Sequence, residues 1–560
     1  MDRPWLKHYP EGTSEDIPTL AHRHLPQMLR EAMRTYGPAI AFTQCMPNGM
    51  NASLTFAEVD RHSDAFAAWL REVAGMKQGD RVAVQMPNCL AYPIVAFGIL
   101  KAGCVLVNTN PLYTAPEMAY QFADAGARAL VIIDLFADRL TTVMAKTKLE
   151  KVVTVRITEF FPAVAGGIIR FVQKFVHKSI PQVEVPYTPF QTALGEGRSR
   201  LGSVKLDAYL GGIASDSLAA LQYTGGTTGV AKGAMLSHGN LLANTAQMLE
   251  MAGRYIKERE ETVLTALPLY HIFAFTVNLL AFFAKGGRNV LIPTPRPPKN
   301  LKPAFEKFPI TWFTGVNTLF NALTHEDWFT SSPPKTLRVA AAGGMALHPA
   351  VAERWRKITG THIVEGYGLT ESSPVLTFNP IGVPNRDGSI GIPIPSTDVR
   401  CVDPTGSTVP DGEPGELIAR GPQIMLGYWQ KADETTKTLK DGWLYTGDVA
   451  RIDDDGYFWI VDRKKDMILV SGFNVYPNEV EEVLAKHPKI KEAGVIGVPD
   501  DRTGEAVKAF VVAREPVTEA EIIAHCKQSL AGYKVPHQIE FRDELPKSPI
   551  GKIIRKDLRK

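Results

Sequence analysis

The sequence predicts an α/β protein with a large N-terminal domain of α/β sheets, a small β-rich subdomain and a small α+β C-terminal domain. The chain has 560 residues, which is too long for one hydrophobic core. Strand-like and helix-like segments alternate from Leu54 onward, as is typical of parallel sheets covered by helices. After Pro393 the pattern changes to short strands and turns.

The first alternating stretch predicts the beginning of a parallel sheet. Residues 56–73 place apolar side chains at helical spacing, and residues 81–86 form a short apolar run that predicts a buried strand. Residues 91–103 are mostly apolar and end in Gly103, so they predict a buried helix that ends at this glycine. Residues 127–133, "ARALVII", predict the next strand.

Four later strands are expected, and several of them end in glycine-rich turns. They are "RNVLIP" (288–293), "ITWFTGV" (310–316), "LRVAAAGG" (337–344) and "THIVEGYG" (361–368). Ligands of open α/β sheets bind beyond the carboxyl ends of the strands. These turns are therefore candidate binding sites.

The remaining chain predicts two smaller units. We expect the N-terminal domain to span residues 1–464, with its β-rich subdomain over about 393–464, and the C-terminal domain to span residues 465–560. The C-terminal domain contains two expected helices, at residues 477–488 and 518–530. The second helix begins with a capping box of Thr518 and Glu521.

A loop rich in glycine and threonine predicts phosphate binding. In "YTGGTTGVAKGA" (223–234), glycines let backbone N–H groups approach an anion, threonine hydroxyls add donors, and Lys232 adds a positive charge. The loop is not a Walker A motif, because Ala231 replaces the second glycine and Gly233 stands where a hydroxyl residue is needed. A flexible surface turn is the alternative interpretation.

Three further stretches carry groups suited to a nucleotide. In "EGYGLTESSP" (365–374), Tyr367 can stack on a flat ring and Glu371 can face a hard cation, although a plain turn explains the pattern too. Asp448 can accept hydrogen bonds from ribose hydroxyls, or it is a turn aspartate. The charges from Arg463 to Lys465 also suit a solvated face, and Lys552 lies in a basic tail that also serves solubility.

In this order, the stretches resemble the adenylate-forming (AMP-binding) superfamily, which includes acyl-CoA synthetases, luciferases and the adenylation domains of peptide synthetases. The resemblance spans Leu54 to Arg559. Residues 441–481, "DGWLYTGDVARIDDDGYFWIVDRKKDMILVSGFNVYPNEVE", resemble the fatty acyl-CoA synthetase signature. "LPLYHIF", "TGVNTLFNAL" and "MLGYWQ" resemble segments of bacterial long-chain fatty acid–CoA ligases.

The resemblance implies a two-step ligase that uses ATP, Mg²⁺ and coenzyme A. A fatty acid carboxylate attacks the α-phosphate of ATP to give acyl-AMP and pyrophosphate, and the thiol of coenzyme A then displaces AMP. Both reactants of the first step are anions, so the site must neutralise charge. The resemblance also implies that the C-terminal domain is mobile and rotates between the two steps about a hinge at Lys465.

The resemblance assigns expected roles to particular residues. Catalytic roles fall on Lys552, Thr370 and Glu371, and phosphate binding on Thr224, Gly225, Gly226, Thr227, Thr228, Gly229 and Lys232. Nucleotide binding falls on Gly343, Gly344, Glu365, Gly366, Tyr367, Gly368, Asp448, Ile460 and Arg463. The resemblance assigns Mg²⁺ binding to Glu371 and Thr228. It assigns the acyl site to His271, Thr314, Gly315 and Val316. Core packing is the alternative for His271. For the acyl chain, "ITWFTGVNTLF" (310–320) and the segment around His271 are expected to offer an apolar wall.

Composition and charge restrict the partners and the cellular compartment that we expect. A net charge of +3 gives no footprint for nucleic-acid binding. Five scattered cysteines without a CxxC pair indicate a reducing compartment, and the N-terminal residues show no apolar signal segment, so we expect a cytoplasmic protein. Residues 159–181 are apolar and basic; they fit peripheral binding to the inner membrane, or an amphipathic helix packed on the domain. A homodimer is a further expectation.

Two alternatives to a long-chain ligase stay open at this stage. One is a ligase of the same superfamily for medium-chain or aryl acids, since tunnel length is not given by the sequence. The other is a membrane-associated protein that mainly traps or transports fatty acids. Transfer to a carrier protein is disfavoured, because no carrier domain follows in the sequence.

Overall fold

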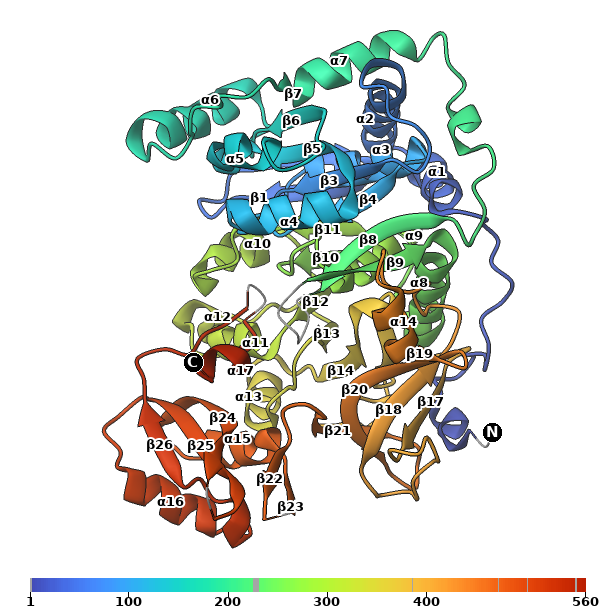
Figure 1. Cartoon of the computed structure of the whole chain (residues 1–560). Helices are drawn as coiled ribbons and strands as arrows, with labels where there is room; N and C mark the ends of the chain where they lie inside the picture. Colours follow the sequence, from blue (N-terminus) through green and yellow to red (C-terminus); the bar gives the residue numbers. More distant parts are fainter. Residues whose placement is uncertain are drawn as a thin grey trace.

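The computed structural model describes residues 3–224, 231–384, 386–471, 473–500, 502–548 and 551–559. Two large sheets with covering helices lie one above the other, a β-rich sheet lies below them on the right, and a C-terminal unit lies at the lower left (Figure 1). The predicted α/β class is confirmed. No helix in the described part of the chain is long and apolar enough to cross a bilayer.

The upper sheet has seven strands, and all but the last pair are parallel. In spatial order they are β7 (Thr188–Pro189), β6 (Lys151–Val155), β5 (Ala127–Ile133), β3 (Arg81–Gln85), β4 (Val105–Asn108), β8 (Leu218–Thr224) and β9 (Lys232–Ser237). The hairpin of β8 and β9 is antiparallel. Strands β3 and β5 are almost wholly buried, because helices cover both faces of a parallel sheet.

The lower sheet has nine strands, six of them parallel. In spatial order they are β16 (Ile392–Pro393), β15 (Val375–Phe378), β14 (Ile363–Gly368), β13 (Val339–Ala342), β12 (Trp312–Gly315), β10 (Thr262–Thr265), β11 (Arg288–Leu291), β1 (Ile40–Cys45) and β2 (Asn51–Thr55). Strands β1 and β10 to β14 run parallel, so their carboxyl ends share one edge.

Helices cover these sheets on both faces. They are α1 (Leu25–Tyr36), α2 (Phe56–Ala68), α3 (Ala91–Lys101), α4 (Ala115–Ala125), α5 (Leu140–Met144), α6 (Ala163–Phe171), α7 (Phe190–Arg200), α8 (His238–Ala252), α9 (Phe282–Ala284), α10 (Lys302–Lys307), α11 (Asn317–Leu323), α12 (Asp327–Ser331) and α13 (Pro349–Thr359). Helix α2 starts at a capping box of Thr55 and Glu58. The helical segment η7 (Ala274–Ala281) packs beside α8 on one face of the lower sheet.

The β-rich sheet is completed by residues from the start of the chain. It contains β17 (Asp398–Val402), β18 (Gly415–Arg420), β20 (Trp443–Ile452), β19 (Leu439–Lys440) and β21 (Phe458–Arg463), with helix α14 (Ala432–Thr438) beside it. Trp5 is 2% exposed and lies against Phe458, with ring centroids 6.3 Å apart. A Cβ atom on Gly456 would stand 2.7 Å from the Trp5 nitrogen, so this close approach needs glycine.

The C-terminal unit has its own sheet and core. Its strands are β22 (Ile468–Val470), β23 (Phe473–Val475), β24 (Ile490–Asp500), β25 (Gly504–Ala513) and β26 (Gln538–Phe541), and its helices are α15 (Pro477–Ala485), α16 (Glu519–Lys527) and α17 (Arg555–Leu558). The capping box of Thr518 and Glu521 is present at the start of α16. A turn containing Lys465 links β21 to β22.

Candidate active site

A cleft of about 2890 Å³ opens at the carboxyl ends of the lower sheet, between this sheet, the β-rich sheet and the C-terminal unit. Its walls include most of the predicted site residues that the structure describes. These are Thr224, Lys232, His271, Gly343, Gly344, Glu365, Gly366, Tyr367, Gly368, Thr370, Glu371, Asp448, Ile460, Arg463, Lys465 and Lys552. Residues from seven separate segments of the sequence therefore meet at one place.

The predicted phosphate loop joins β8 to β9. Thr224 pairs with Lys232 across the start of this hairpin. The predicted residues between them, Gly225, Gly226, Thr227, Thr228 and Gly229, lie outside the described residues. The Lys232 ammonium lies 2.8 Å from a Glu434 carboxylate oxygen and 4.7 Å from the centroid of the Tyr428 ring. An incoming anion would compete with Glu434 for this lysine.

Glu371 offers a carboxylate to the same part of the cleft. It lies in the short helical segment η9 (Thr370–Ser372), and Tyr428 donates a hydrogen bond of 2.6 Å to its Oε1. Burial and the nearby Glu371 raise the pKa of Tyr428, so its hydroxyl stays a donor. No cluster of three potential metal ligands occurs among the described residues. A single carboxylate fits Mg²⁺ that arrives with a phosphate, because Mg²⁺ commonly binds one or two carboxylates plus substrate oxygens.

Glycines border the cleft where strands come close to other groups. A Cβ on Gly366 would stand 2.9 Å from the Phe378 ring, and one on Gly368 would stand 1.9 Å from the Pro374 carbonyl oxygen. Gly343 would bring its Cβ to 3.1 Å from the Phe273 ring. Gly344 has φ of +78°, which other residues rarely adopt. Glycine is therefore needed at Gly343, Gly366 and Gly368 because neighbouring protein groups occupy the place that a side chain would take.

Glu365 is a buried acid at this edge. Its Oε2 accepts a hydrogen bond of 2.7 Å from the Leu347 N–H. Burial raises the pKa of Glu365 to about 8, and the Leu347 N–H opposes part of this rise. A carboxyl group that is mainly protonated near neutral pH can donate a hydrogen bond as well as accept one.

Asp448 is held in place by two neighbours. It is 8% exposed, and Tyr367 donates a hydrogen bond of 2.6 Å to its Oδ2. Arg463 is its cross-strand partner in β20 and β21, with Nε 3.3 Å from Oδ1. Burial and the Asp448 charge raise the pKa of Tyr367. Ile460 lies two residues before Asp462 on β21 and adds an apolar surface to the same wall.

Lys552 reaches the cleft on a loop of the C-terminal unit. Its backbone closes a turn with Ser548, through a Ser548 N–H to Lys552 carbonyl bond of 2.7 Å. A Cβ on Gly551 would stand 2.5 Å from Thr318 Oγ1, so the loop lies directly against α11. Burial lowers the pKa of Lys552 to about 8, with a further contribution from the positive charge of Arg463.

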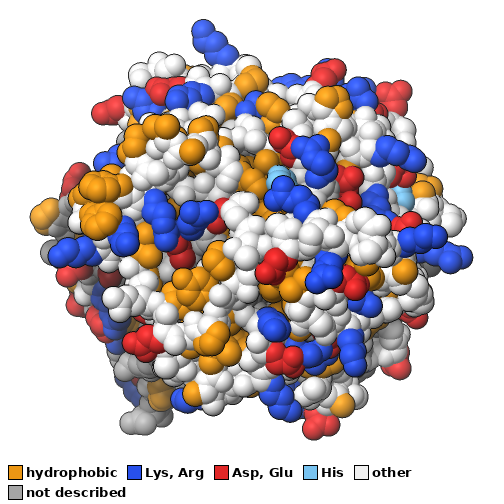
Figure 2. Space-filling view, turned by 90° about the horizontal axis from the view of Figure 1, so that it is seen from above, with side chains coloured by type: hydrophobic (Ala, Val, Ile, Leu, Met, Phe, Trp, Pro, Cys, Tyr) orange, Lys and Arg blue, Asp and Glu red, His pale blue; other side chains and the backbone are white. Residues whose placement is uncertain are grey.

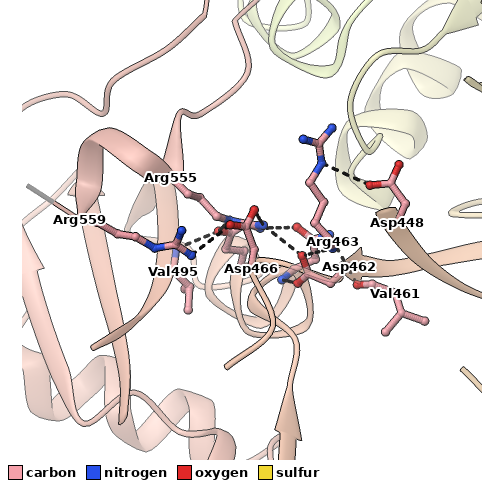
Figure 3. A network of polar contacts seen from close by, with 10 residues as sticks. Asp448, Val461, Asp462, Arg463, Asp466, Val495, Arg555 and Arg559 are labelled. Atoms are coloured by element: carbon pink, nitrogen blue, oxygen red, sulfur yellow. Dashed lines mark hydrogen bonds and ion pairs between the residues drawn. The ribbon is translucent and has the colours of Figure 1, made fainter. Parts of the chain in front are cut away.

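A network of charged groups holds the Lys552 segment to the end of β21 (Figure 3). Arg555 lies 3.1 Å from Asp462 Oδ1 and 2.8 Å from Glu481 Oε2. Asp462 also accepts a hydrogen bond of 2.7 Å from the Asn478 N–H. Arg559 adds a contact of 3.0 Å to Asp466. Because Asp462 precedes the Lys465 turn and Arg555 follows it, these contacts bridge the two parts of the chain.

The predicted acyl residues divide into two groups. His271 lines the cleft, and burial lowers its pKa to about 4, so it is neutral at physiological pH. Thr314, Gly315 and Val316 are not among the described residues that line the cleft. The Thr314 hydroxyl is instead 2.8 Å from Asn278 Nδ2, in a buried hydrogen-bond network.

Sequence reasoning missed several apolar residues of the cleft and the Arg555 network. The missed wall residues are Met248, Val277, Ala341, Val375 and Phe378. Trp312 and Phe273 lie in the two stretches that predict an apolar wall, "ITWFTGVNTLF" and the segment around His271, and both line the cleft. For Arg555 the only signal was a basic tail, which has many explanations.

A cleft at the carboxyl ends of parallel strands, ringed by a lysine, an aspartate–arginine pair and glycine edges, is typical of α/β enzymes that bind nucleotides. The comparisons narrow this class. The chain belongs to the AMP-binding enzyme family, whose model matches residues 29–429. The model of the AMP-binding enzyme C-terminal domain matches residues 479–552.

Known relatives agree with this family over the full chain. The chain is 48% identical to a long-chain-fatty-acid–CoA ligase of Yersinia pestis, over 100% of this chain and 98% of that protein. It is 36% identical to a long-chain-fatty-acid–CoA ligase of Bacillus subtilis, over 99% and 97% of the two chains. The crystal structure of an anthranilate CoA ligase in complex with anthranoyl-AMP matches with a TM-score of 0.84 and 27% identity, over 97% of both chains.

Proposed function

We propose that this protein is a long-chain fatty acid–CoA ligase that works through an acyl-AMP intermediate. The relatives that match it over nearly their whole length carry that activity in their names. One observation carries the proposal: Lys552 of the C-terminal unit lines the same cleft as Asp448 and Arg463. A cation at this place suits the joining of a carboxylate to a nucleotide triphosphate, since both reactants are anions.

In the first step, the carboxylate oxygen attacks the α-phosphorus of ATP and pyrophosphate leaves. Lys552 is proposed to bridge the carboxylate and an α-phosphate oxygen, which removes their repulsion and aligns them for attack. Lys232 and Thr224 are proposed to hold the outer phosphates together with the loop between them. Preorganised charges act more strongly in a cleft from which water is largely excluded.

The nucleotide is proposed to lie between the glycine edge and the β-rich sheet. Asp448 would accept hydrogen bonds from the ribose hydroxyls, because Tyr367 and Arg463 fix its two oxygens toward the cleft. The edge at Gly343, Gly344 and Gly366 would receive the adenine ring. Glu371 and Thr370 would hold Mg²⁺ beside the α-phosphate, and the ion would supply further charge neutralisation.

In the second step, the coenzyme A thiol attacks the acyl carbon and AMP leaves. Lys552 and its loop occupy one side of the cleft, so we propose that the C-terminal unit rotates about Lys465 to admit the thiol. The part of the chain from residue 1 to residue 464 is then the fixed domain, and residues 465–560 are the mobile domain. Residues 470–477 would face the cleft after this rotation.

The direct test is product formation by the purified protein. With ATP, Mg²⁺ and palmitate, pyrophosphate should be released, and AMP release should then depend on coenzyme A. A panel of long-chain, medium-chain and aryl acids would separate a long-chain ligase from medium-chain and aryl acid ligases of the same superfamily. The proposal is wrong if no organic acid supports pyrophosphate release.

We also propose that the α6 region binds the surface of an anionic membrane. Side chains at helical spacing on α6 and the adjoining segment η4 (Val172–Val176) are exposed to solvent: Val164, Ile168, Phe171 and Phe175 are 77%, 54%, 59% and 59% exposed. The exposure of these side chains argues against a helix that packs its apolar face on the domain, since only Ile169 of α6 is buried. Figure 2 shows hydrophobic and basic side chains next to each other on the side of the molecule where α6 lies.

The basic residues Lys174, His177 and Lys178 adjoin this apolar face and are exposed. An apolar face flanked by lysines suits insertion at the headgroup level of an anionic bilayer. A Phe171→Ser/Phe175→Ser variant should lose sedimentation with phosphatidylglycerol-containing vesicles, whereas Phe541→Ser, which changes an exposed phenylalanine of β26, should not. Equal sedimentation of all three proteins would contradict the proposal. A homodimer stays a prediction of the sequence.

A further inference from the structure

One arm of the cleft is apolar and penetrates beneath two helices. Met248 of α8 and Val277 of η7 line this arm from the helix side. Ala341 of β13 and Trp312 of β12 line it from the sheet side. The same residues belong to one hydrophobic core cluster between these helices and the lower sheet. The arm is therefore a channel into the core, separate from the charged ring at the mouth of the cleft.

The channel can be followed along the strands to its end. Side chains of β12 and β13 that point to the same face are paired in register, Thr314 beside Ala341 and Trp312 beside Val339. Ala341 lines the cleft, whereas Val339 is not among the described residues that do so. Two residues of a strand span about 6–7 Å. The channel thus passes over Ala341 and stops at the level of Trp312.

Trp312 is fixed at this position. Its indole N–H donates a hydrogen bond of 3.1 Å to the Tyr255 carbonyl oxygen. Its ring packs edge-on against Phe282, with centroids 5.3 Å apart and an interplanar angle of 72°. Val263 and Met251 are buried in the same core cluster and do not line the cleft within the described part of the chain. A ring held on two sides with packed core around it makes a rigid wall.

We propose that Trp312 closes the deep end of the acyl site and sets the longest straight chain that the enzyme accepts. The inference rests on the proposed function and names a residue that determines its specificity. Each methylene group that the channel accommodates contributes favourable burial, worth about a fourfold gain in affinity. A methylene group beyond the indole has no such place, because it would have to displace a hydrogen-bonded and packed ring.

The test is the dependence of kcat/KM on chain length for Trp312→Phe, with straight-chain acids from six to twenty-two carbons. The smaller ring should move the longest efficiently used acid to a greater length. For acids just beyond the wild-type limit, kcat/KM relative to that of a shorter acid should rise by roughly 15-fold, as expected for about two further methylene groups.

Trp355→Phe is a matched control. Trp355 is also fully buried with a hydrogen-bonded indole N–H, but it lies in the core on the opposite face of the same sheet and does not line the cleft. Its chain-length profile should match that of the wild type. If Trp312→Phe lowers activity by one factor at every length, Trp312 is only a structural residue and the inference is wrong.

A second variant tests the same channel from the opposite direction. Ala341→Leu narrows the channel before Trp312 and should reduce kcat/KM for long acids while leaving short acids nearly unchanged. Contact can also be measured directly, because a fatty acid brominated at its terminal carbon should quench the fluorescence of wild-type protein more than that of Trp312→Phe. Equal quenching would overturn the inference. A wild-type protein that activates no acid would instead refute the proposed function.

Discussion

The two sides of the cleft are built in different ways. Glu365, Tyr367 and Asp448 lie on strands β14 and β20, and buried contacts fix each of them. Lys552 lies on a loop of the C-terminal unit, which charged groups such as Asp462 and Arg555 hold to the rest of the chain. The Asp462–Arg555 pair is itself largely buried, with side chains 0% and 12% exposed, so the loop depends on a charged contact that needs both partners. We expect the strands to form a fixed wall for the nucleotide, and the proposed rotation of the C-terminal unit would make Lys552 part of a removable wall.

Removing the charge of the removable wall should have the largest effect. Lys552→Ala should lower the rate of acyl-AMP formation by about 10²–10³-fold, because it deletes a charge aimed at the transition state. The reaction of preformed acyl-AMP with coenzyme A should be nearly unchanged, since the proposed rotation takes Lys552 out of the cleft in that step. Pyrophosphate release and thioester formation, measured separately, check this.

The control for this variant is Lys534→Ala, which removes an ion-paired lysine of the C-terminal unit that does not line the cleft. It should retain both half-reactions. Equal loss of both half-reactions in Lys552→Ala would mean that Lys552 belongs to the fixed wall.

A change in the fixed wall should affect both steps. Asp448→Asn should weaken ribose binding by roughly 10–100-fold, since hydrogen bonds to a charged group contribute about 1.5–3 kcal/mol. KM for ATP and the affinity for AMP should change together. Asp398→Asn, an ion-paired aspartate of the same sheet, is the matched control and should leave nucleotide affinity unchanged. An effect on one half-reaction alone would contradict the comparison.

The pH dependence of acyl-AMP formation should reflect the ionisation of Lys552. The pKa of Lys552 is lowered to about 8 by burial and by Arg463, while Asp448 and Asp466 oppose the shift. In its proposed role Lys552 acts as a protonated amine, so kcat/KM for acyl-AMP formation should fall as pH rises through 8. Between pH 7 and pH 8.5 the loss should be about fourfold, and it should be absent from the residual activity of Lys552→Ala. A flat wild-type profile up to pH 9 would rule out this titration.

The smallest effect is expected from the contacts that bridge the turn. Asp462→Asn removes the negative charge that faces Arg555, and should slow acyl-AMP formation about two- to threefold while sparing the thioester step. Glu540→Gln, which breaks ion pairs within the C-terminal unit only, is the control. Equal slowing of both steps by Asp462→Asn would show that the contact stabilises the fold without favouring one domain orientation.

The sequence predicted the strands and much of the charged cleft because both leave local signals. Apolar runs such as residues 127–133 can be recognised as strands, and glycine turns mark the edge at Gly366. The stretch "ITWFTGVNTLF" predicts an apolar wall, but only the packing of the folded chain shows that Trp312 itself borders the cavity. The resemblance assigned Thr314 to the acyl site, and in the structure its hydroxyl is hydrogen-bonded to Asn278 in a buried network.

Arg555 shows a second reason why part of the site escapes prediction. In the sequence it is one of several basic residues near the end of the chain, and basic tails are commonly solvated. Its partners Asp462 and Glu481 are 93 and 74 residues away, so only the folded chain brings the charges together. Long-range ion pairs of this kind have no local pattern.

The docking of Trp5 on the β-rich sheet has a consequence for biosynthesis. Its partner surface around Gly456 and Phe458 leaves the ribosome some 450 residues later, which corresponds to roughly 20–90 s at usual elongation rates. During that interval the surface that buries Trp5 is incomplete, so Trp5 and the residues around it stay exposed to solvent. Arg3 and Tyr9, which contact Asp398 and the Pro393 carbonyl oxygen, can make these contacts only after residue 398 has left the ribosome.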